Sequence, residues 1–481
     1  MKTRSHRHWA WCALAPIILI GDVRESAHGH ILPVSAAKSG TETKVASLWT
    51  RTAGEDWPSF LGAHRDSCSS ETGLITDWTK EPLRIVWQRE SGVGHSAGAI
   101  DRGRYFHFER VGDMARVVCL HAESGAELWH FEYPTDFVDM YKYDGGPRST
   151  PIVDGDRVYT IGAEGMLHCL RVDDGAVIWK CDTVKQFSIV KNFFGVGSSP
   201  IIDDDLLIAM VGGSPPADQQ VPDGQLDRVH GNGTGIVAFD KFSGVVRYAV
   251  TNELASYSSP VIAHVDGHET GVALCRDSLI AFEPHTGRID FRLPWRSELI
   301  ESVNASTPVV HDNEVLIGEA YGPGSCMLAF QPTGYQFLWR DLHSGRGKIL
   351  QPQFDTPVFY QDHAYACSGR YVPQMELRCI DWKTGKIMWR ERTGQRSSRL
   401  EVDGFLINLQ ERGTLQLIRA NPLKYELVAE CVLQSEAGGS DGTPAVPLLT
   451  FPCWTAPVLS HGLLYLRGKD RLVCVELIRD R

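Results

Sequence analysis

The sequence predicts an all-β chain folded as an eight-bladed β-propeller of four-stranded antiparallel blades, and two repeating signals carry this prediction. The first is a hairpin motif that returns about every 50 residues: an apolar strand, a turn ending in Gly, and a second strand closing on an aromatic residue. The second is a Pro that opens a short apolar run upstream of the hairpins. A fixed period of this length indicates one repeated supersecondary unit, and four antiparallel strands per unit are a propeller blade.

The hairpin motif occurs in six copies. They are Val117–Trp129, Leu167–Trp179, Ile236–Tyr248, Leu279–Phe291, Met327–Trp339 and Leu377–Trp389. In five copies the aromatic residue lies four positions after the Gly, and in the fifth copy it lies five after. The Gly supplies the positive φ that such a turn needs. We expect the aromatic residue to pack between blades, as part of the core rather than as a cofactor contact.

The Pro-marked runs allow the blades to be counted, because Pro is tolerated at the first residue of a strand. These runs begin at Pro151, Pro200, Pro260, Pro308, Pro357 and Pro457. Their spacings are 49, 60, 48, 49 and 100 residues, and the last spacing equals two pitches. One blade without the Pro is therefore predicted at 398–430, and a first blade without it at about 97–131.

The two ends of the predicted ring belong together. The last blade has only three strands, ending at Arg471–Ile478, and an unpartnered strand with an aromatic residue, Trp87, lies far upstream at Pro82–Glu90. We expect this upstream strand to complete the last blade and close the ring. The one long spacing is explained by residues 212–235, rich in Pro, Gly and Asp, which we expect to form an exposed loop within the third blade.

Composition and the N-terminus narrow the class of protein. The chain has 481 residues and a formal net charge of −11; it shows no basic cluster for nucleic acid and no apolar run long enough for a membrane span within the repeats. Residues 1–21 resemble a secretory signal peptide, residues 22–54 a polar linker, and residues 55–481 the propeller. We therefore expect an exported monomer, periplasmic or extracellular. Five cysteines on equivalent strands are expected to be small buried hydrophobes: Cys119, Cys169, Cys275, Cys379 and Cys474.

The candidate site is the mouth of the central channel. The stretches before each Pro converge on the axis from every blade, so polar side chains distant in sequence become neighbours there. The candidates are His95, Tyr143, Asp144, Arg148, Asn192, Glu301, Asn304, Gln353, Asp355 and Arg396. Two nearby carboxylates, Glu301 and Asp355, favour a cation or a cationic group between them. The alternative is that these side chains cap loop backbone at a solvated rim.

Two motifs carry a family resemblance. The repeat A-x-D-x-x-T-G-x-x-x-W resembles that of the quinoprotein alcohol dehydrogenase-like superfamily, and the segment Asp56–Trp78 resembles the leader of exported bacterial pyrroloquinoline quinone (PQQ)-like repeat proteins. Members include PQQ dehydrogenases and the outer-membrane assembly scaffold. The PQQ enzymes use a Glu–Asn–Asp set for calcium, an Asp base and an Arg. By this resemblance Glu301 and Asn304 are metal candidates, and Asp355 and Arg148 catalytic candidates, although no motif is matched.

Two functions follow from the resemblance. The first is an exported PQQ-like repeat propeller that acts without catalysis, as a scaffold binding a small polar ligand or other envelope proteins. The alternative is a PQQ- and calcium-dependent dehydrogenase that oxidises an alcohol or sugar. The sequence lacks an adjacent Cys pair and a C-x-x-C-H haem site, and it is shorter than typical family dehydrogenases. These features favour the first function, because the fold alone does not decide the activity.

Overall fold

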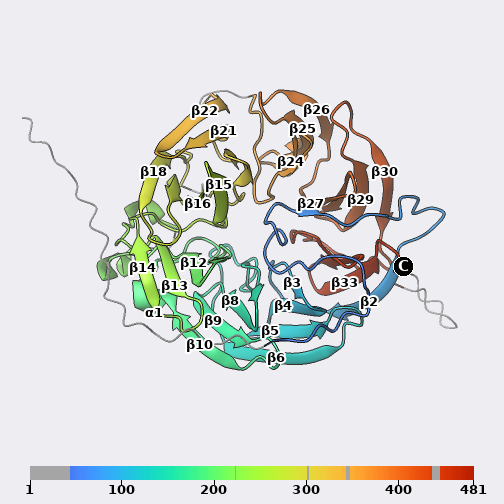
Figure 1. Ribbon diagram of the computed structural model, residues 1–481, viewed down its shortest axis with the longest axis horizontal. Coiled ribbons are helices and arrows are strands. Elements are labelled where there is room, and N and C mark those ends of the chain that lie inside the picture. The colour runs from blue at the N-terminus through green and yellow to red at the C-terminus, as the bar shows by residue number, and fades with distance from the viewer. Residues whose placement is uncertain (1–43, 223, 301–302, 343–346, 436–444, 481) are drawn as a thin grey trace, which may run out of the picture.

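The chain forms a closed ring of blades around a central axis (Figure 1). The computed structural model describes residues 44–222, 224–300, 303–342, 347–435 and 445–480. Within these residues the strands form eight sheets of four antiparallel strands each, and one sheet has an additional short parallel strand. The predicted eight-bladed propeller is therefore confirmed. The predicted signal peptide at residues 1–21, and the linker as far as residue 43, lie outside the described residues.

The first four blades follow the chain from the inner to the outer strand. Blade 1 contains β3 (Ala99–Asp101), β4 (Arg104–Val111), β5 (Met114–His121) and β6 (Glu127–Pro134). Blade 2 contains β7 (Ile152–Asp154), β8 (Arg157–Ile161), β9 (Met166–Arg171) and β10 (Val177–Asp182), followed by the short helix α1 (Thr183–Phe187). Blade 3 contains β11 (Ile201–Asp203), β12 (Leu206–Met210), β13 (Ile236–Asp240) and β14 (Val246–Val250). Blade 4 contains β15 (Val261–Val265), β16 (His268–Leu274), β17 (Ser278–Phe282) and β18 (Ile289–Pro294).

The remaining blades repeat this order, with two departures. Blade 5 contains β19 (Val309–His311), β20 (Glu314–Glu319), β21 (Gly324–Gln331) and β22 (Gly334–Arg340). Blade 6 contains β23 (Val358–Tyr360), β24 (His363–Ser368), β25 (Glu376–Asp381) and β26 (Ile387–Arg392). Blade 7 contains β27 (Ser397–Val402), β28 (Phe405–Gln410), β29 (Thr414–Arg419) and β30 (Leu427–Val432), with β1 (Cys68–Ser69) added parallel to β27. Blade 8 contains β31 (Val458–Ser460), β32 (Leu463–Arg467), β33 (Arg471–Glu476) and, from far upstream, β2 (Arg84–Glu90).

The ring closes where the sequence predicts. Strand β2 pairs antiparallel with β33, in a register that places Arg84 opposite Glu476 and Glu90 opposite Arg471. In Figure 1 the blue β2 lies beside the red β33. The unpartnered upstream strand therefore supplies the outer strand of blade 8, and no half-formed blade is left at the seam.

The aromatic residue of each hairpin joins its blade to the next one. Trp87 is 8% exposed and donates an indole hydrogen bond to the Ala122 carbonyl of blade 1. A Cβ on Gly125 in the same turn would lie 2.7 Å from the Trp87 ring, so this position needs Gly for packing as well as for its φ of 70°. The same donation recurs from Trp129 to Val172, Trp179 to Lys241, Tyr248 to Pro284, Trp339 to Trp382 and Trp389 to Asn421. The predicted interblade packing is confirmed.

The insertion at residues 212–235 lies between β12 and β13 of the third blade, as predicted. It is not exposed along its whole length, and this part of the prediction is wrong. Short 3-10 helices form at Pro216–Gln220 and Leu226–Arg228, and Leu226 and Val229 are buried against a cluster that includes Phe193. A few apolar side chains are therefore enough to fasten a loop whose composition is mostly polar.

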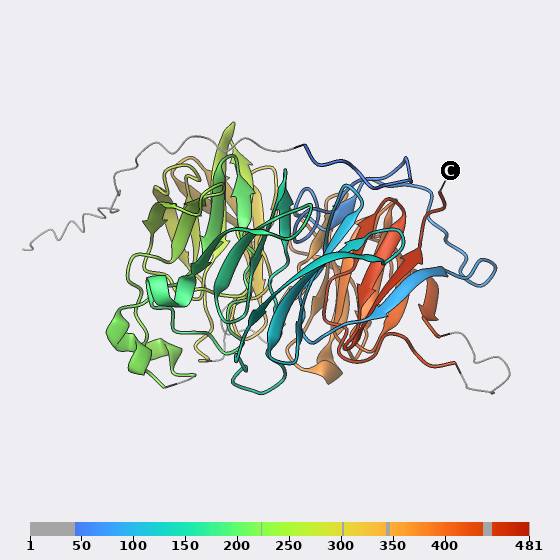
Figure 2. The same ribbon diagram turned by 90° about the horizontal axis from the view of Figure 1, so that it is seen from below.

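The leader segment, residues 56–69, crosses one face of the ring. Trp57 pairs with Ile100, the Pro58 carbonyl accepts from Val153, Arg65 donates to the Ile202 carbonyl, and Cys68 pairs with Glu401. All four partners lie toward the ends of innermost strands. Figure 2 shows the blue N-terminal segment on the face opposite the long green loops. The leader therefore covers the end of the channel opposite the predicted mouth.

Two further expectations concern the described residues. The eleven cysteines there form no disulfide, and Cys119, Cys169, Cys275, Cys379 and Cys474 are buried as expected. In the same part of the chain, no helix has the length and apolar character needed to span a membrane.

Candidate functional site

A cavity of about 860 Å³ occupies the centre of the ring. Its walls come mainly from the loops that precede the innermost strands, together with loops between the second and third strands of the blades. Of the predicted site residues, seven line it: His95, Tyr143, Asp144, Arg148, Gln353, Asp355 and Arg396. The sequence argument that the loops before the strands converge on one cavity therefore holds for these residues.

The leader forms the floor of the cavity. Phe60, Leu61 and Ser67 line it from the leader side. The segment is held in a compact turn, because Ser67 donates its N–H to the Leu61 carbonyl at 2.9 Å and Gly62 donates to the Ser59 carbonyl at 3.1 Å. Exposed aromatic residues, among them Tyr143, lie at the other end. The cavity is thus closed below by the leader and open at the loop face.

One wall carries a charged network built by the loops before β3 and β7. His95 Nε2 lies 3.0 Å from Asp144 Oδ2, and Arg148 contacts Asp139 at 3.1 Å and Asp144 at 3.8 Å. Burial alone would raise the pKa of Asp144, but the bond from His95 and the charges of His95 and Arg148 hold this pKa at about 2. Burial lowers the pKa of His95. Asp139 also accepts the backbone N–H groups of Tyr141, Tyr143 and Asp144, so it fixes the loop that presents the network.

Asp355 is engaged by a buried partner. Its Oδ2 accepts from Arg399 at 2.8 Å and from the Cys367 N–H at 3.1 Å, and the Arg399 side chain has no solvent exposure. Burial raises the pKa of Asp355, while the Arg399 charge opposes that rise. Arg399 also donates to the Ser397 carbonyl. The carboxylate expected to attract a cation is therefore already neutralised by a fixed guanidinium.

A third group connects loops of blades 5, 6, 7 and 8. Arg396 donates to Gln353 and lies 3.4 Å from Glu411, which also accepts the indole N–H of Trp454 at 2.9 Å. Gln353 in turn contacts the Tyr321 hydroxyl at 3.4 Å. The polar groups of this wall are thus held by protein partners. Tyr321 and Trp454 also line the cavity.

Two cations that the sequence argument missed also line the cavity. Arg370 lies over the rings of Tyr321 and Tyr371, at 4.8 and 5.1 Å from their centroids, and Lys469 comes from the β32–β33 loop. Among the described residues, neither side chain has an ion pair with a carboxylate. Both lie in loops between the second and third strands of a blade. The sequence argument considered only the segments before the Pro residues and therefore did not include these loops.

The cavity wall therefore has a positive excess. Among the described lining residues, five side chains are cationic and two are carboxylates. The cations are Arg148, Arg370, Arg396, Arg399 and Lys469, and the carboxylates are Asp144 and Asp355. This excess is local, because the whole chain has a formal net charge of −11. Outside the lining, Asp139 and Glu411 pair with Arg148 and Arg396, so the excess that remains is the charge of Arg370 and Lys469. This charge favours an acidic ligand, in contrast to the cation expected from the sequence.

Two of the other predicted residues, Asn192 and Asn304, do not line the cavity. Asn304 is 1% exposed, and its amide donates to the carbonyls of Cys275, Arg276 and Trp295 at 2.8 to 3.1 Å. Asn192 accepts the N–H of Phe193. Both amides thus form hydrogen bonds with loop backbone. This is the alternative role, capping of loop backbone, that the sequence analysis gave for these side chains. Glu301 lies outside the described residues.

A family comparison agrees with this fold. A family model described as outer membrane protein assembly factor BamB matches residues 78–215 and 212–421. The chain belongs to this family. The resemblance found in the sequence is confirmed, and the matched residues extend from just before β2 to the third strand of blade 7. No curated protein sequence matches the chain.

Two solved structures have the same fold as this chain. BamB from Moraxella catarrhalis superposes with a TM-score of 0.54 at 12% identity, covering 83% of this chain and 99% of that chain. The quinohemoprotein alcohol dehydrogenase from Comamonas testosteroni superposes with a TM-score of 0.58, also at 12% identity, covering 89% of this chain and 81% of that chain. An outer membrane protein assembly factor and an alcohol dehydrogenase thus share the fold, and the fold alone does not decide the function of this chain.

Proposed function

We propose that this BamB-family chain is a non-catalytic binding propeller that holds a small acidic ligand in its central cavity. The observation that carries the proposal is the unbalanced pair of cations, Arg370 and Lys469, on the wall of a cavity closed below by the leader. Guanidinium groups bind carboxylates through paired, charge-assisted hydrogen bonds. A carboxylate held there would balance charge that the described protein groups leave unbalanced.

The aromatic lining indicates a ligand that also has a flat or ring-shaped face. Phe194 stacks against Tyr143 with an interplanar angle of 15° and a centroid distance of 6.1 Å, and Trp454 contacts Phe354 and Phe451. Concave sites that combine apolar rings with a few fixed polar groups are typical of small-molecule binding. Aromatic carboxylates and sugar acids satisfy both requirements.

PQQ with calcium is the alternative ligand pair that the fold implies. PQQ itself is a flat acid and suits the rings and the cations, and when bound it would supply redox chemistry. Calcium needs several oxygen ligands that converge on one point. Among the described residues these do not converge, because Asn304 lies outside the cavity lining and Asp355 is bound by Arg399. We therefore place the binding function first and assign no dehydrogenation step.

A second candidate, docking of an envelope protein, is favoured by the rim of the cavity. Tyr143, Tyr371 and Phe451 are 64%, 56% and 52% exposed, and exposed apolar clusters often mark protein contacts. We also propose that the chain is exported, on the pattern of residues 1–21 and the family description. A fusion of residues 1–54 to alkaline phosphatase tests export, since this reporter is active only outside the cytoplasm; an inactive fusion would contradict it.

Titration calorimetry of the full chain tests the ligand proposal. The probes are D-glucuronate, 4-hydroxybenzoate and PQQ with and without calcium, and D-glucose is the neutral comparison. We expect at least one acid to bind and D-glucose not to bind. Arg370→Ala should weaken acid binding about 10- to 100-fold, since a hydrogen bond to a charged group contributes about 1.5–3 kcal/mol.

The control is Lys185→Ala, which removes an exposed cation on α1, outside the cavity lining. Its affinity for the acid should equal that of the parent chain. Failure of all three acids to bind, or unchanged binding by Arg370→Ala, contradicts the proposal. Calcium-dependent PQQ binding accompanied by dye reduction would instead establish the dehydrogenase.

A further inference from the structure

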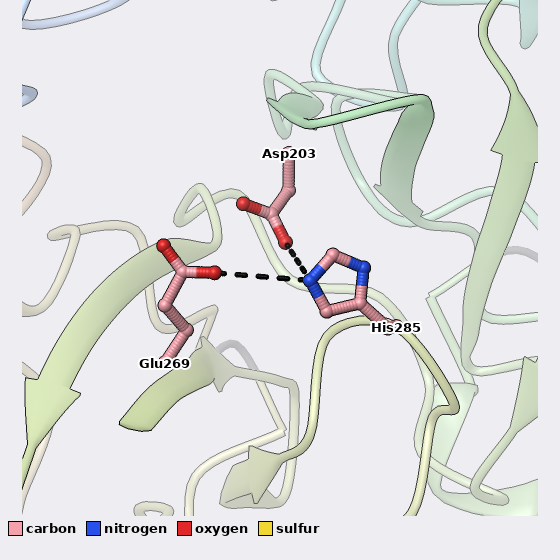
Figure 3. Close-up of side chains that lie close together, drawn as sticks. All are labelled: Asp203, Glu269 and His285. Carbon is pink, nitrogen blue, oxygen red and sulfur yellow. Dashed lines mark ion pairs between the residues drawn. The ribbon is translucent and has the colours of Figure 1, made fainter. Parts of the chain in front are cut away.

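A cluster of metal-ligating side chains lies on the leader face, outside the central cavity. Asp203 ends β11 in blade 3, whereas Glu269 in β16 and His285 in the β17–β18 turn belong to blade 4. One ligand atom from each lies within 4.8 Å of the others. Figure 3 shows one oxygen of each carboxylate directed at the same nitrogen of the imidazole. Asp204, next to Asp203, adds a third carboxylate at 3.8 Å from His285 Nε2.

The imidazole of His285 faces three carboxylates at once. Its Nε2 lies 3.8 Å from an oxygen of each of them, too far for a hydrogen bond to any. Other His–carboxylate pairs in the chain involve one carboxylate, either at bonding distance, as for His95–Asp144 at 3.0 Å and His230–Asp218 at 3.1 Å, or at 3.8 Å, as for His311–Asp312 and His461–Asp56. The imidazole nitrogen is thus surrounded by oxygens with which it forms no hydrogen bond.

Asp203 supplies a second and independent observation. Its side chain is 11% exposed, and its Oδ2, the oxygen that faces His285, is buried without a hydrogen-bond partner among the described residues. A buried carboxylate oxygen without a partner is costly, and a cation at this point would supply the missing partner.

We propose that His285, Asp203 and Glu269, with Asp204 as a fourth ligand, bind a divalent transition cation of the zinc class that bridges blades 3 and 4. Zinc accepts imidazole nitrogen and carboxylate oxygen at 2.0–2.2 Å, so tetrahedral ligand atoms lie about 3.4 Å apart. The spacing of 3.8 Å is close to that value. Glu269, His285 and Asp204 are 41%, 44% and 81% exposed, so small rotations can close the gap. Calcium and magnesium prefer oxygen ligands throughout.

The test is zinc binding by the tag-free full chain after dialysis against a chelator. Titration calorimetry and metal analysis should give one zinc ion per chain, and cobalt should replace it with a visible absorption band. Calcium and magnesium should not compete. His285→Ala and Glu269→Gln should weaken zinc binding more than 100-fold, since loss of even an outer partner of a metal ligand costs about 10- to 100-fold.

The matched control is His230→Ala, which removes an exposed His paired with a single carboxylate, Asp218, in the blade 3 insertion. This variant should bind zinc like the parent chain. The absence of zinc binding, or equal binding by the parent and His285→Ala, would overturn the proposal. A melting temperature that zinc raises in the parent and in His230→Ala, but not in His285→Ala, would show that the ion bridges the two blades.

Discussion

Replacing Glu401 by Gln is expected to stabilise the protein above pH 7 and to leave its stability unchanged below about pH 4.5. Glu401 lies in β27, beside the leader, and is 5% exposed. Burial, together with the charges of Asp66 and Asp403, raises its pKa from 4.5 to about 7. Its Oε1 accepts the Gly404 N–H at 2.9 Å, and a Gln side chain can accept the same bond.

The sign follows from linkage. A carboxyl whose pKa is raised by folding contributes stability below its unfolded pKa, and this contribution is lost as the pH rises through the folded pKa. For Glu401 the loss occurs between about pH 4.5 and 7. At 1.36 kcal/mol per pKa unit the full penalty is about 3 kcal/mol, and partial hydration reduces it to about 2 kcal/mol. A neutral Gln avoids this penalty.

Guanidinium unfolding of the parent and of Glu401→Gln at pH 5 and pH 8 measures the effect, because the rest of the pH dependence is common to both chains. The free energy of unfolding should differ by about 2 kcal/mol at pH 8 and by much less at pH 5. Glu314→Gln is the contrasting control. Glu314 accepts from Trp382 and Lys383, so its loss should destabilise at both pH values. Equal effects of Glu401→Gln at the two pH values would refute the reasoning.

Three other changes test the fold and the loops. Trp87→Ala should lower the free energy of unfolding by about 3–5 kcal/mol in guanidinium, because a buried aromatic is lost at the seam; an unchanged midpoint would contradict closure by β2. Asp227→Ala should speed tryptic cleavage after Arg228, measured by mass spectrometry, because Asp227 pairs with Arg276 and Arg296; cleavage at the parent rate would show that this anchor is unimportant. Asn304→Ala should lower thermal stability yet leave acid binding in the cavity unchanged, and a selective loss of binding would place Asn304 in the ligand site.

The fold was predictable because its signals are local and repeated. In five of the six copies the turn Gly lies against the aromatic residue of the preceding blade, as Gly125 does against Trp87, so one repeat contains most of the information for one interface. The regular spacing of the repeats then gives the number of blades, and it includes the blade that lacks the Pro. The insertion was predicted less well, because the burial of Leu226 and Val229 depends on a cluster from distant loops that no local pattern encodes.

The position of the site could be predicted from the sequence, but the net charge of its wall could not. Convergence on the axis follows from topology, which is why His95 and Arg396 line the cavity as expected. The partner of each charge depends on tertiary contacts, and Arg399, which neutralises Asp355, belongs to the next blade. The sequence gives no local sign that Asn304 turns its amide toward three backbone carbonyls rather than toward the channel.

The leader connects the stability of the ring with the shape of the site. Residues 56–69 contact the innermost strands of blades 1, 2, 3 and 7, and Phe60, Leu61 and Ser67 of the same segment form the cavity floor. A ligand must therefore enter from the loop face, past the exposed rings of Tyr143 and Phe451. Because the floor is built from a segment bonded to four blades, its position is set by the closed ring, whereas the mouth is built from loops that vary freely in length between blades. We therefore expect the specificity of the proposed binding function to be determined at the mouth, where Arg370 lies.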